Sequence, residues 1–251
     1  MRIRILVLGN EIAGSGSRNW IDSFRQLNHH VHCVSHRLFV PRLDGIFGRA
    51  VIRMLGPIIL IPEYNREILS ADEKLNSELV FVYKGQYVTP RTLQELKRRG
   101  RKVVLLYPDV SLYTHGSRIP KCVPYYDHVF TTKSFGLKDL RENLGYERAT
   151  LLAHSAHPDI HRPVEHSGET MRYYGCEASF IGTWSPKKEK ILTHLIQGIP
   201  DLDLKIWGAQ WNRVNSRILG GAIQNEPIVG GLYAAGISCS RINIAILSEV
   251  R

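Results

Sequence analysis

The chain has 251 residues, of which 43% are hydrophobic and 22% are charged. This is the composition of a globular protein with enough length for one large domain or two smaller ones. The formal net charge of +10 favours anionic partners: nucleic acid, an anionic lipid surface or phosphorylated small molecules. No apolar stretch approaches the roughly 18 residues that a transmembrane helix needs, whereas a peripheral membrane contact is compatible with the charge.

Residues 2–9 form an apolar run that ends in glycine and predicts a buried parallel strand. The loop NEIAGSGS follows, then a helix from about Ser17 to Asn28 and a second strand over 31–36, which together make a βαβ opening. Further strands are predicted over 78–85, 101–109, 128–133 and 149–154, and helical segments over 43–76 (interrupted by Pro57 and Pro62), after Thr89 and over 134–145. Such alternation predicts a mostly parallel sheet with helices on both faces.

Local signals mark the ends of these helices. Thr89 is predicted as an N-cap with Pro90 at the first helical position, Ser134 is a candidate cap, and Gly145 is a stop signal. The basic cluster over 97–102 is interpreted as the solvated end of a helix, where the helix dipole favours positive charge.

The pattern changes after residue 156, because 157–175 lacks periodicity and contains two prolines. Four histidines lie in or beside this segment: His154, His157, His161 and His166. Spacings of three and four would align three of them on a helix as zinc ligands, but Pro158 and Pro163 argue against a helix. We interpret the segment as an interdomain linker; a metal site, or a catalytic or substrate role for one histidine, is the alternative.

A second series of elements begins at residue 176. Strands are predicted over 176–184, 202–208 and 242–247, with helices over 186–198, after Trp211 and after the sequence PIVGG. About three strands are few for a doubly wound sheet. The predicted domains are therefore 1–156, a linker over 157–175, and a partial second domain over 176–251.

The succession of motifs resembles the GT-B glycosyltransferases, particularly the CgeB-type, spore-maturation group. The matching features are the joining segment LLAHSAHPDIHRP, the strand FIGTW with lysines shortly after it, the strand ending Ile206-Trp207-Gly208, and PIVGG with Tyr233. The resemblance implies two Rossmann-like α/β domains, the first on the acceptor side and the second binding a nucleotide-sugar donor. Family members usually continue well beyond a strand like INIAIL, so this chain resembles a truncated member with an incomplete second domain.

The implied activity is transfer of a sugar from a nucleotide-diphosphate-sugar donor to an unknown acceptor, whether polysaccharide, lipid-linked or small molecule. The donor is a co-substrate, and no other cofactor is expected. A metal-independent mechanism is expected, in which lysines and the helix dipole offset the charge that a divalent ion would offset elsewhere. Four separated cysteines without a CxxC pair, and an N-terminus unlike a signal peptide, predict a cytoplasmic protein.

Two elements are candidates for binding the donor diphosphate. The first is the loop with Gly14 and Gly16, where small residues let backbone N–H groups approach an anion; an ordinary flexible loop is the alternative. The second combines Gly182, Thr183 and Trp184 with lysines in the first turn of the next helix, where a cation opposes the helix dipole and so hints at an anionic ligand; simple solvent exposure is the alternative. These lysines are Lys187 and Lys188.

The family resemblance also places the nucleobase near Trp207, Gly208 and Val229, although Trp207 could equally be plain core. Asp109 is the first candidate for a general base, because it follows a strand and should lie at its carboxyl end. A turn or capping role is its alternative, and His115 and His154 are the rival bases.

Two further hypotheses belong to other classes. The chain could be a catalytically inactive remnant or binding module of a glycosyltransferase, which the short second domain favours. A nucleic-acid-binding role would fit the charge, but no reader motif or basic–aromatic interleaving is present, so no nucleic-acid partner is predicted.

Overall fold

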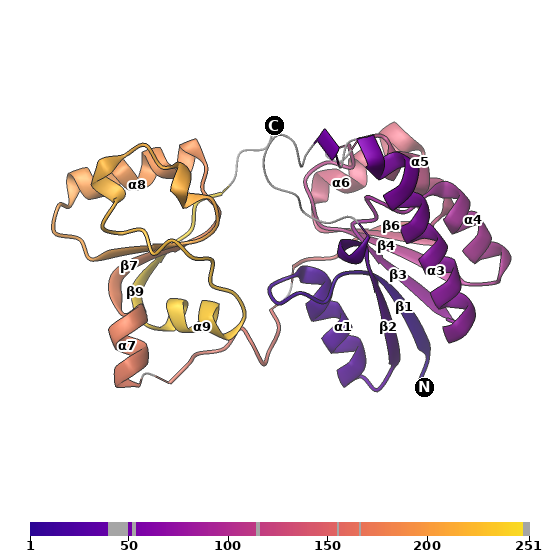
Figure 1. Ribbon diagram of the computed structural model, residues 1–251, viewed down its shortest axis with the longest axis horizontal. Helices are drawn as coiled ribbons and strands as arrows, with labels where there is room; N and C mark the ends of the chain where they lie inside the picture. The colour runs from indigo at the N-terminus through magenta and orange to yellow at the C-terminus, as the bar shows by residue number, and fades with distance from the viewer. Residues whose placement is uncertain (40–49, 52–53, 114–115, 155, 166, 248–251) are drawn as a thin grey trace. The chain divides into compact units, whose positions relative to one another are not determined.

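The computed structural model describes residues 1–39, 50–51, 54–113, 116–154, 156–165 and 167–247. The chain forms two compact units, Met1–Ser155 (unit 1) and Ala156–Arg251 (unit 2), and each is built on its own parallel sheet (Figure 1). None of the described helices is long and apolar enough to cross a membrane.

Unit 1 contains a parallel sheet with the strand order β2-β1-β3-β4-β5-β6. Strand β1 pairs with β2 on one side and β3 on the other, so that Leu8 lies opposite both Val34 and Val82. The sheet therefore grows first in one direction and then in the other, starting from β1. Its strands are β1 Arg4–Gly9, β2 His30–Ser35, β3 Leu79–Tyr83, β4 Lys102–Tyr107, β5 His128–Thr131 and β6 Ala149–Leu151.

The two faces of this sheet are covered by different helices (Figure 1). Because side chains alternate along a strand, Ile5 and Val7 pack with Ile21 of α1 on one face, whereas Leu6 and Leu8 belong to the opposite face. The helical elements of unit 1 are α1 Gly16–Gln26, η1 His36–Leu38, η2 Gly56–Leu60, α3 Ile61–Leu75, α4 Pro90–Arg98, α5 Arg118–Cys122, η3 Val123–Tyr125, α6 Ser134–Lys138 and η4 Asp139–Asn143.

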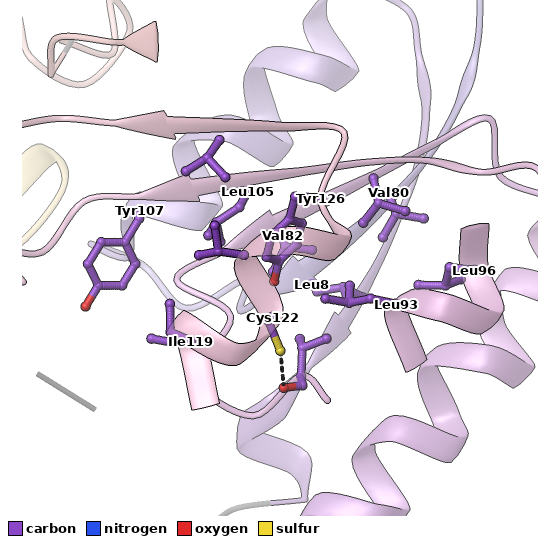
Figure 2. Close-up of a cluster of buried hydrophobic side chains, with 14 of the residues drawn as sticks. Leu8, Val80, Val82, Leu93, Leu96, Leu105, Tyr107, Ile119, Cys122 and Tyr126 are labelled. Carbon is purple, nitrogen blue, oxygen red and sulfur yellow. Dashed lines mark hydrogen bonds between the residues drawn. The ribbon is translucent and has the colours of Figure 1, made fainter. Parts of the chain in front are cut away.

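The larger core lies between the sheet and helices α3, α4 and α5. Figure 2 shows Leu93 and Leu96 of α4, and Ile119 and Cys122 of α5, beside the strand residues of this core, all fully buried. Cys122 Sγ also donates to the carbonyl oxygen of Val88 at 3.4 Å. Each buried aliphatic side chain contributes about 1.5–3 kcal/mol of burial free energy. This layer therefore fixes the positions of the strands that it covers.

Most predicted helix ends in unit 1 are confirmed. Thr89 caps α4, since its hydroxyl accepts from Thr92 N at 3.3 Å, and Gly145 has a φ of +60° just after η4. Pro62 does not interrupt a helix, because it lies in the first turn of α3, where an N–H has no intrahelical acceptor. The cap at Ser134 was wrong: Lys133 is the N-cap and Ser134 is the first helical residue. Residues 43–49 of the predicted helical segment lie outside the described residues.

The basic cluster after α4 has a structural role rather than a purely solvated one. The carboxylate of Asp72 is fully buried and receives Arg99 Nη1 at 3.2 Å, Arg101 Nε at 3.0 Å and the Ser77 hydroxyl at 2.5 Å. A buried carboxylate needs such partners, because leaving it unpaired would cost several kcal/mol. Two of the arginines therefore tie the end of α4 to α3.

Unit 2 has three parallel strands among its described residues, in the order β8-β7-β9. The helix predicted after Trp211 is replaced by two single turns. Helix α7 lies inside the segment assigned to the linker, where Ser167 caps it by accepting from Thr170 N at 3.1 Å. The elements are α7 Gly168–Tyr174, β7 Cys176–Ile181, α8 Pro186–Gly198, β8 Leu204–Trp207, η5 Trp211–Arg213, η6 Arg217–Leu219, α9 Gly231–Ser238 and β9 Ser240–Ile244.

We expect Gly208→Ala to destabilise unit 2 by roughly 2–4 kcal/mol. Gly208 has a φ of +147°, and an added Cβ would overlap the carbonyl oxygen of Gly182, a backbone atom that cannot swing away. Thermal unfolding followed by tryptophan fluorescence measures this, because Trp184, Trp207 and Trp211 lie in unit 2. Gly198→Ala is the matched control, since nothing lies within 4 Å of its added Cβ; equal melting of the two variants would contradict the expectation.

Candidate functional site

Unit 1 has a pocket of about 770 Å³ at the carboxyl ends of β1 and β3. This is the point where the strand order reverses, and open α/β sheets bind ligands at such a point because the two flanking loops diverge there. Its volume lies in the range of small-molecule sites, roughly 300–1,000 Å³. Most of its lining comes from three segments: the loop after β1, the turn after β3, and the residues that follow β2. Tyr64 of α3 and Arg118 of α5 complete it.

The loop after β1 supplies the first wall and contains the predicted Gly14 and Gly16. Gly14 has a φ of +77°. Gly16 lies against the ring of Tyr83, whose hydroxyl oxygen would collide with any Cβ at that position. Ser17 is buried and ties the loop to itself, because its hydroxyl donates to Asn10 O at 2.8 Å and accepts from Asn10 N at 2.9 Å. The loop is thus held by its own polar groups.

The turn after β3 supplies the second wall and has an unusual backbone. Lys84 and Gly85 both have left-handed conformations, with φ of +67° and +72°. The lysine conformation costs on the order of 1 kcal/mol or more, and such conformations concentrate at functional sites. Lys84 Nζ lies 3.0 Å from Asp109 Oδ2. The turn therefore brings a pocket-lining cation to the first candidate base.

Burial, and then the nearby charge of Asp109, raise the pKa of Tyr83 above its ordinary value. The Tyr83 hydroxyl can donate a hydrogen bond at the edge of the pocket.

The pocket also contains residues that the sequence did not single out. His36 and Arg37 follow β2, and Arg118 begins α5. The centroid of the Tyr87 ring lies 5.3 Å from that of the His36 ring, and the two rings are tilted by 43°. Arg118 Nη1 donates to Gln86 O at 3.0 Å, which fixes its guanidinium beside the turn. Among these lining residues, only Lys84 and Gly85 could have been singled out from the sequence, as a cation and a glycine directly after an apolar strand. The others come together only through the tertiary fold.

The predicted catalytic residues are placed differently from one another. Asp109 follows β4 and is oriented by Lys84, as described above. His154 is exposed near the end of unit 1 and does not line the pocket. His115 lies outside the described residues. Of the two described candidates, the structure places Asp109, and not His154, next to a residue that lines the switch-point pocket.

In unit 2, the predicted donor-binding residues surround the end of β7. Gly182 N donates to Trp207 O at 2.8 Å and Trp184 N donates to Ala209 O at 2.9 Å, so the loop follows the end of β8 backbone to backbone. Lys188 Nζ donates to Thr183 O at 2.9 Å and covers the Phe180 ring at 5.8 Å. Lys187 is exposed at the start of α8.

A buried carboxylate organises the same region. Glu189 accepts from Trp184 Nε1 at 2.8 Å and from the backbone N–H groups of Asn215 and Ser216 at 2.8 and 2.9 Å. Burial acts to raise the pKa of Glu189, but these three hydrogen bonds together hold it below its ordinary value. Arg213 lies over the Trp184 ring, with its guanidinium carbon 4.5 Å from the ring centroid.

The residues expected near the nucleobase differ in exposure. Trp207 is fully buried and packs with Ile228 and Tyr174. Gly208 N donates to Glu226 O at 2.9 Å. Val229 is 42% exposed and precedes Gly230, whose φ of +60° opens α9. Backbone at Gly208 and the start of α9, rather than the Trp207 ring, is what this part of unit 2 presents.

The histidine-rich segment folds on unit 2. His157 N donates to His161 Nδ1 at 2.7 Å, and Val164 N donates to Ser238 Oγ of α9 at 3.0 Å. The His157 ring is buried, and neither ring nitrogen has a partner among the described residues. The described residues contain no group of three or more His, Cys, Asp or Glu side chains that could hold a metal ion. His166 lies outside them.

No protein-family model matches the chain, and no curated protein matches its sequence. Solved structures do match. The putative UDP-N-acetylglucosamine 2-epimerase from Listeria monocytogenes has a TM-score of 0.62 at 6% identity, over 94% of this chain and 72% of that chain. S. aureus MnaA, in a co-structure with UDP, has a TM-score of 0.56 at 11% identity, over 91% and 70%. UGT73P12 from Glycyrrhiza uralensis, complexed with glycyrrhetinic acid 3-O-monoglucuronide, has a TM-score of 0.52 at 9% identity, over 92% and 69%.

At such low identity this likeness is one of fold. The chain is an α/β protein with parallel sheets that resemble the Rossmann-like domains of GT-B proteins, which confirms the predicted fold class. Membership of the CgeB-type group stays a prediction.

We expect Glu189→Gln to destabilise unit 2 by roughly 1–3 kcal/mol at pH 7, because an amide cannot accept from all three donors without opposing one of them. The pKa of Glu189 is lowered in the folded state, so its contribution is present above the unfolded value of about 4.3 and is lost as pH falls through the folded pKa. The difference in melting between wild type and variant should therefore shrink below that pH. Glu169→Gln, an exposed change in α7, is the control; a difference independent of pH would contradict the assignment.

Proposed function

We propose that the protein is a glycosyltransferase of the CgeB-type group that works in the cytoplasm. In this proposal, unit 2 binds a nucleotide-diphosphate-sugar and unit 1 binds the acceptor. The observation that carries it is the pocket at the switch point of unit 1, which is large enough for a sugar and has the candidate base Asp109 next to its lining residue Lys84. The GT-B-like fold supports the same division of labour.

Sugar transfer requires that the negative charge of the diphosphate be offset as the nucleoside diphosphate leaves. Lys187 is exposed in the first turn of α8, and Lys188 uses one of its three donors on Thr183 O. We assign the diphosphate to these lysines together with backbone N–H groups near Gly182, and the base to the backbone near Gly208 and Val229. A nucleotide held in this way needs no divalent ion, because lysine charge and the helix dipole offset the charge of the diphosphate.

Transfer requires the acceptor hydroxyl to lose a proton as its oxygen attacks the anomeric carbon. We assign this proton to the carboxylate of Asp109, which Lys84 holds in place at 3.0 Å. The nucleoside diphosphate then leaves with the electrons of the broken glycosidic bond. His154 and His115 are the alternative bases, and the variants below discriminate between them.

Two other functions are compatible with the same fold. A binding module or inactive remnant would bind nucleotide and release no product. A 2-epimerase, the activity named for the Listeria monocytogenes structure, would change the sugar without needing an acceptor. Incubation with a panel of nucleotide sugars, followed by NMR of the products, distinguishes them; free epimer without acceptor dependence would overturn the transferase proposal.

The double variant Lys187→Ala with Lys188→Ala should weaken UDP binding by about tenfold or more, because two charge-assisted contacts to the diphosphate are lost. UDP is the first nucleotide to test, since the S. aureus structure contains it. Isothermal titration calorimetry measures the affinity, and Lys190→Ala, in the second turn of the same helix, is the matched control. Unchanged affinity in the double variant would remove the phosphate assignment.

Asp109→Asn should lower the turnover number at least about 100-fold, the usual size of a general-base contribution, while UDP affinity stays unchanged. Asp139→Asn, on the surface of η4, controls for the loss of a carboxylate elsewhere in unit 1. Thermal melting verifies that the unpaired Lys84 leaves the fold intact. A comparable loss in His154→Gln or His115→Gln, with Asp109→Asn still active, would transfer the role to that histidine.

A further inference from the structure

The charge of the unit 1 pocket narrows the chemistry of what it binds. Four lining residues carry or can carry positive charge: His36, Arg37, Lys84 and Arg118. No Asp or Glu side chain lines the pocket within the described part of the chain. One of these cations, Lys84, is compensated by Asp109, whose carboxylate oxygen lies 3.0 Å from Lys84 Nζ.

The two arginines remain without a carboxylate partner among the described residues. Arg118 is half-buried, and its one hydrogen bond goes to a neutral acceptor, the carbonyl oxygen of Gln86. Arg37 is also half-buried and makes no hydrogen bond or ion pair with any described residue. Partial burial of an uncompensated charge is costly, and an anionic ligand offsets that cost.

Among the described arginines of unit 1, seven others pair with a carboxylate and four are exposed without one, so half-buried arginines without a carboxylate partner occur only at the pocket. Arg99 and Arg101 bind the buried Asp72, and Arg25 binds Glu11 at 2.8 Å. The excess charge at the pocket is therefore a local property and not a general consequence of the basic composition. Guanidinium groups suit phosphate and carboxylate, because their planar donors can bind two oxygens at once.

The remaining lining suits a sugar. Tyr64, Tyr83 and Tyr87 bring flat apolar rings into the wall, and Tyr83 keeps a protonated hydroxyl. Ser15 and Gln86 add neutral polar groups from the two turns. Such a mixture of aromatic surface and a few fixed polar groups is typical of small-molecule sites.

We propose that the acceptor is anionic: a sugar or sugar-like molecule whose phosphate or carboxylate group binds Arg37 and Arg118 in the unit 1 pocket. The term acceptor rests on the proposed transferase function, whereas the anion site itself does not. Lys84 contributes its charge mainly to Asp109, so the two arginines select the ligand, while Asp109 is the base assigned to the acceptor hydroxyl.

Calorimetric titration of the full chain with inorganic phosphate, glucose 1-phosphate, glucuronate and glucose tests this proposal. At millimolar concentrations the anions should bind and glucose should not. Tighter binding of glucose 1-phosphate than glucuronate identifies phosphate as the group, and the reverse order identifies carboxylate. Binding of glucose as strongly as the anions, or failure of all three anions to bind, would overturn the inference.

Arg37→Gln and Arg118→Gln should each weaken anion binding by about tenfold or more. Arg2→Gln is the matched control, because Arg2 is exposed ahead of β1, at the opposite end of that strand from the pocket. An equal loss in the control would show that only the overall charge attracts the anion, and would overturn the site. Arg37→Gln removes no contact with described residues, so it keeps the test valid even if Arg118→Gln disturbs the turn.

A parallel UDP titration separates the two proposals. Retained anion binding with no UDP binding would overturn the transferase function and leave the anion pocket standing. Normal UDP binding and turnover with no anion binding, or with no effect of the arginine variants, would overturn the anion pocket alone.

Discussion

The position of β1 at the centre of the first sheet is the constraint on which unit 1 depends. Because β1 pairs in parallel with β2 on one side and β3 on the other, the loops that leave β1 and β3 must diverge at the carboxyl end of the sheet. The close contact of Gly16 with Tyr83 then sets how near α1 can approach β3. The pocket is the space left between these loops. The hydrophobic cores on the two faces of the sheet hold the strands from which the loops leave.

Electrostatics in unit 1 is governed by pairing rather than by total charge. The buried Asp72 forms ion pairs with Arg99 and Arg101, and Asp109 forms one with Lys84. These ion pairs make Arg99, Arg101 and Lys84 parts of the scaffold, whereas the sequence predicted only a solvated helix end over 97–102. Among the described arginines of unit 1, half-buried guanidinium groups without a carboxylate partner occur only at Arg37 and Arg118, at the pocket. A sugar bearing one or two negative charges is a better match to such a site than a nucleic acid backbone, which needs an extended basic surface.

Unit 2 is organised by close approach of backbone to backbone. The ends of β7 and β8 run so close that a Cβ on Gly208 would overlap the carbonyl oxygen of Gly182. Glu189 fixes the adjoining loop by binding three donors from two segments. A loop held in this way presents its backbone and the exposed Lys187 in a constant geometry, which is what recognition of a diphosphate requires.

Much of the architecture could be predicted from local pattern, since the apolar runs of β1, β3 and β4 are too short and too uniform to be anything but buried strands. Thr89 and Gly145 marked helix ends, because capping and positive φ are chemical properties of single residues. The same reasoning failed at Ser134 and after Trp211, where a neighbouring residue caps the helix or where Glu189 binds the backbone N–H groups that a helix would have used.

The candidate site shows the same division more sharply. The sequence by itself determined the glycine loop after β1 and the place of Asp109 at the end of a strand, because both follow from one element and its turn. Only the tertiary structure decided that Arg37, Lys84 and Arg118, separated by up to 81 positions in the sequence, line one pocket. The physical reason is that side-chain convergence depends on which strands pair, and strand pairing is fixed by packing across the whole sheet.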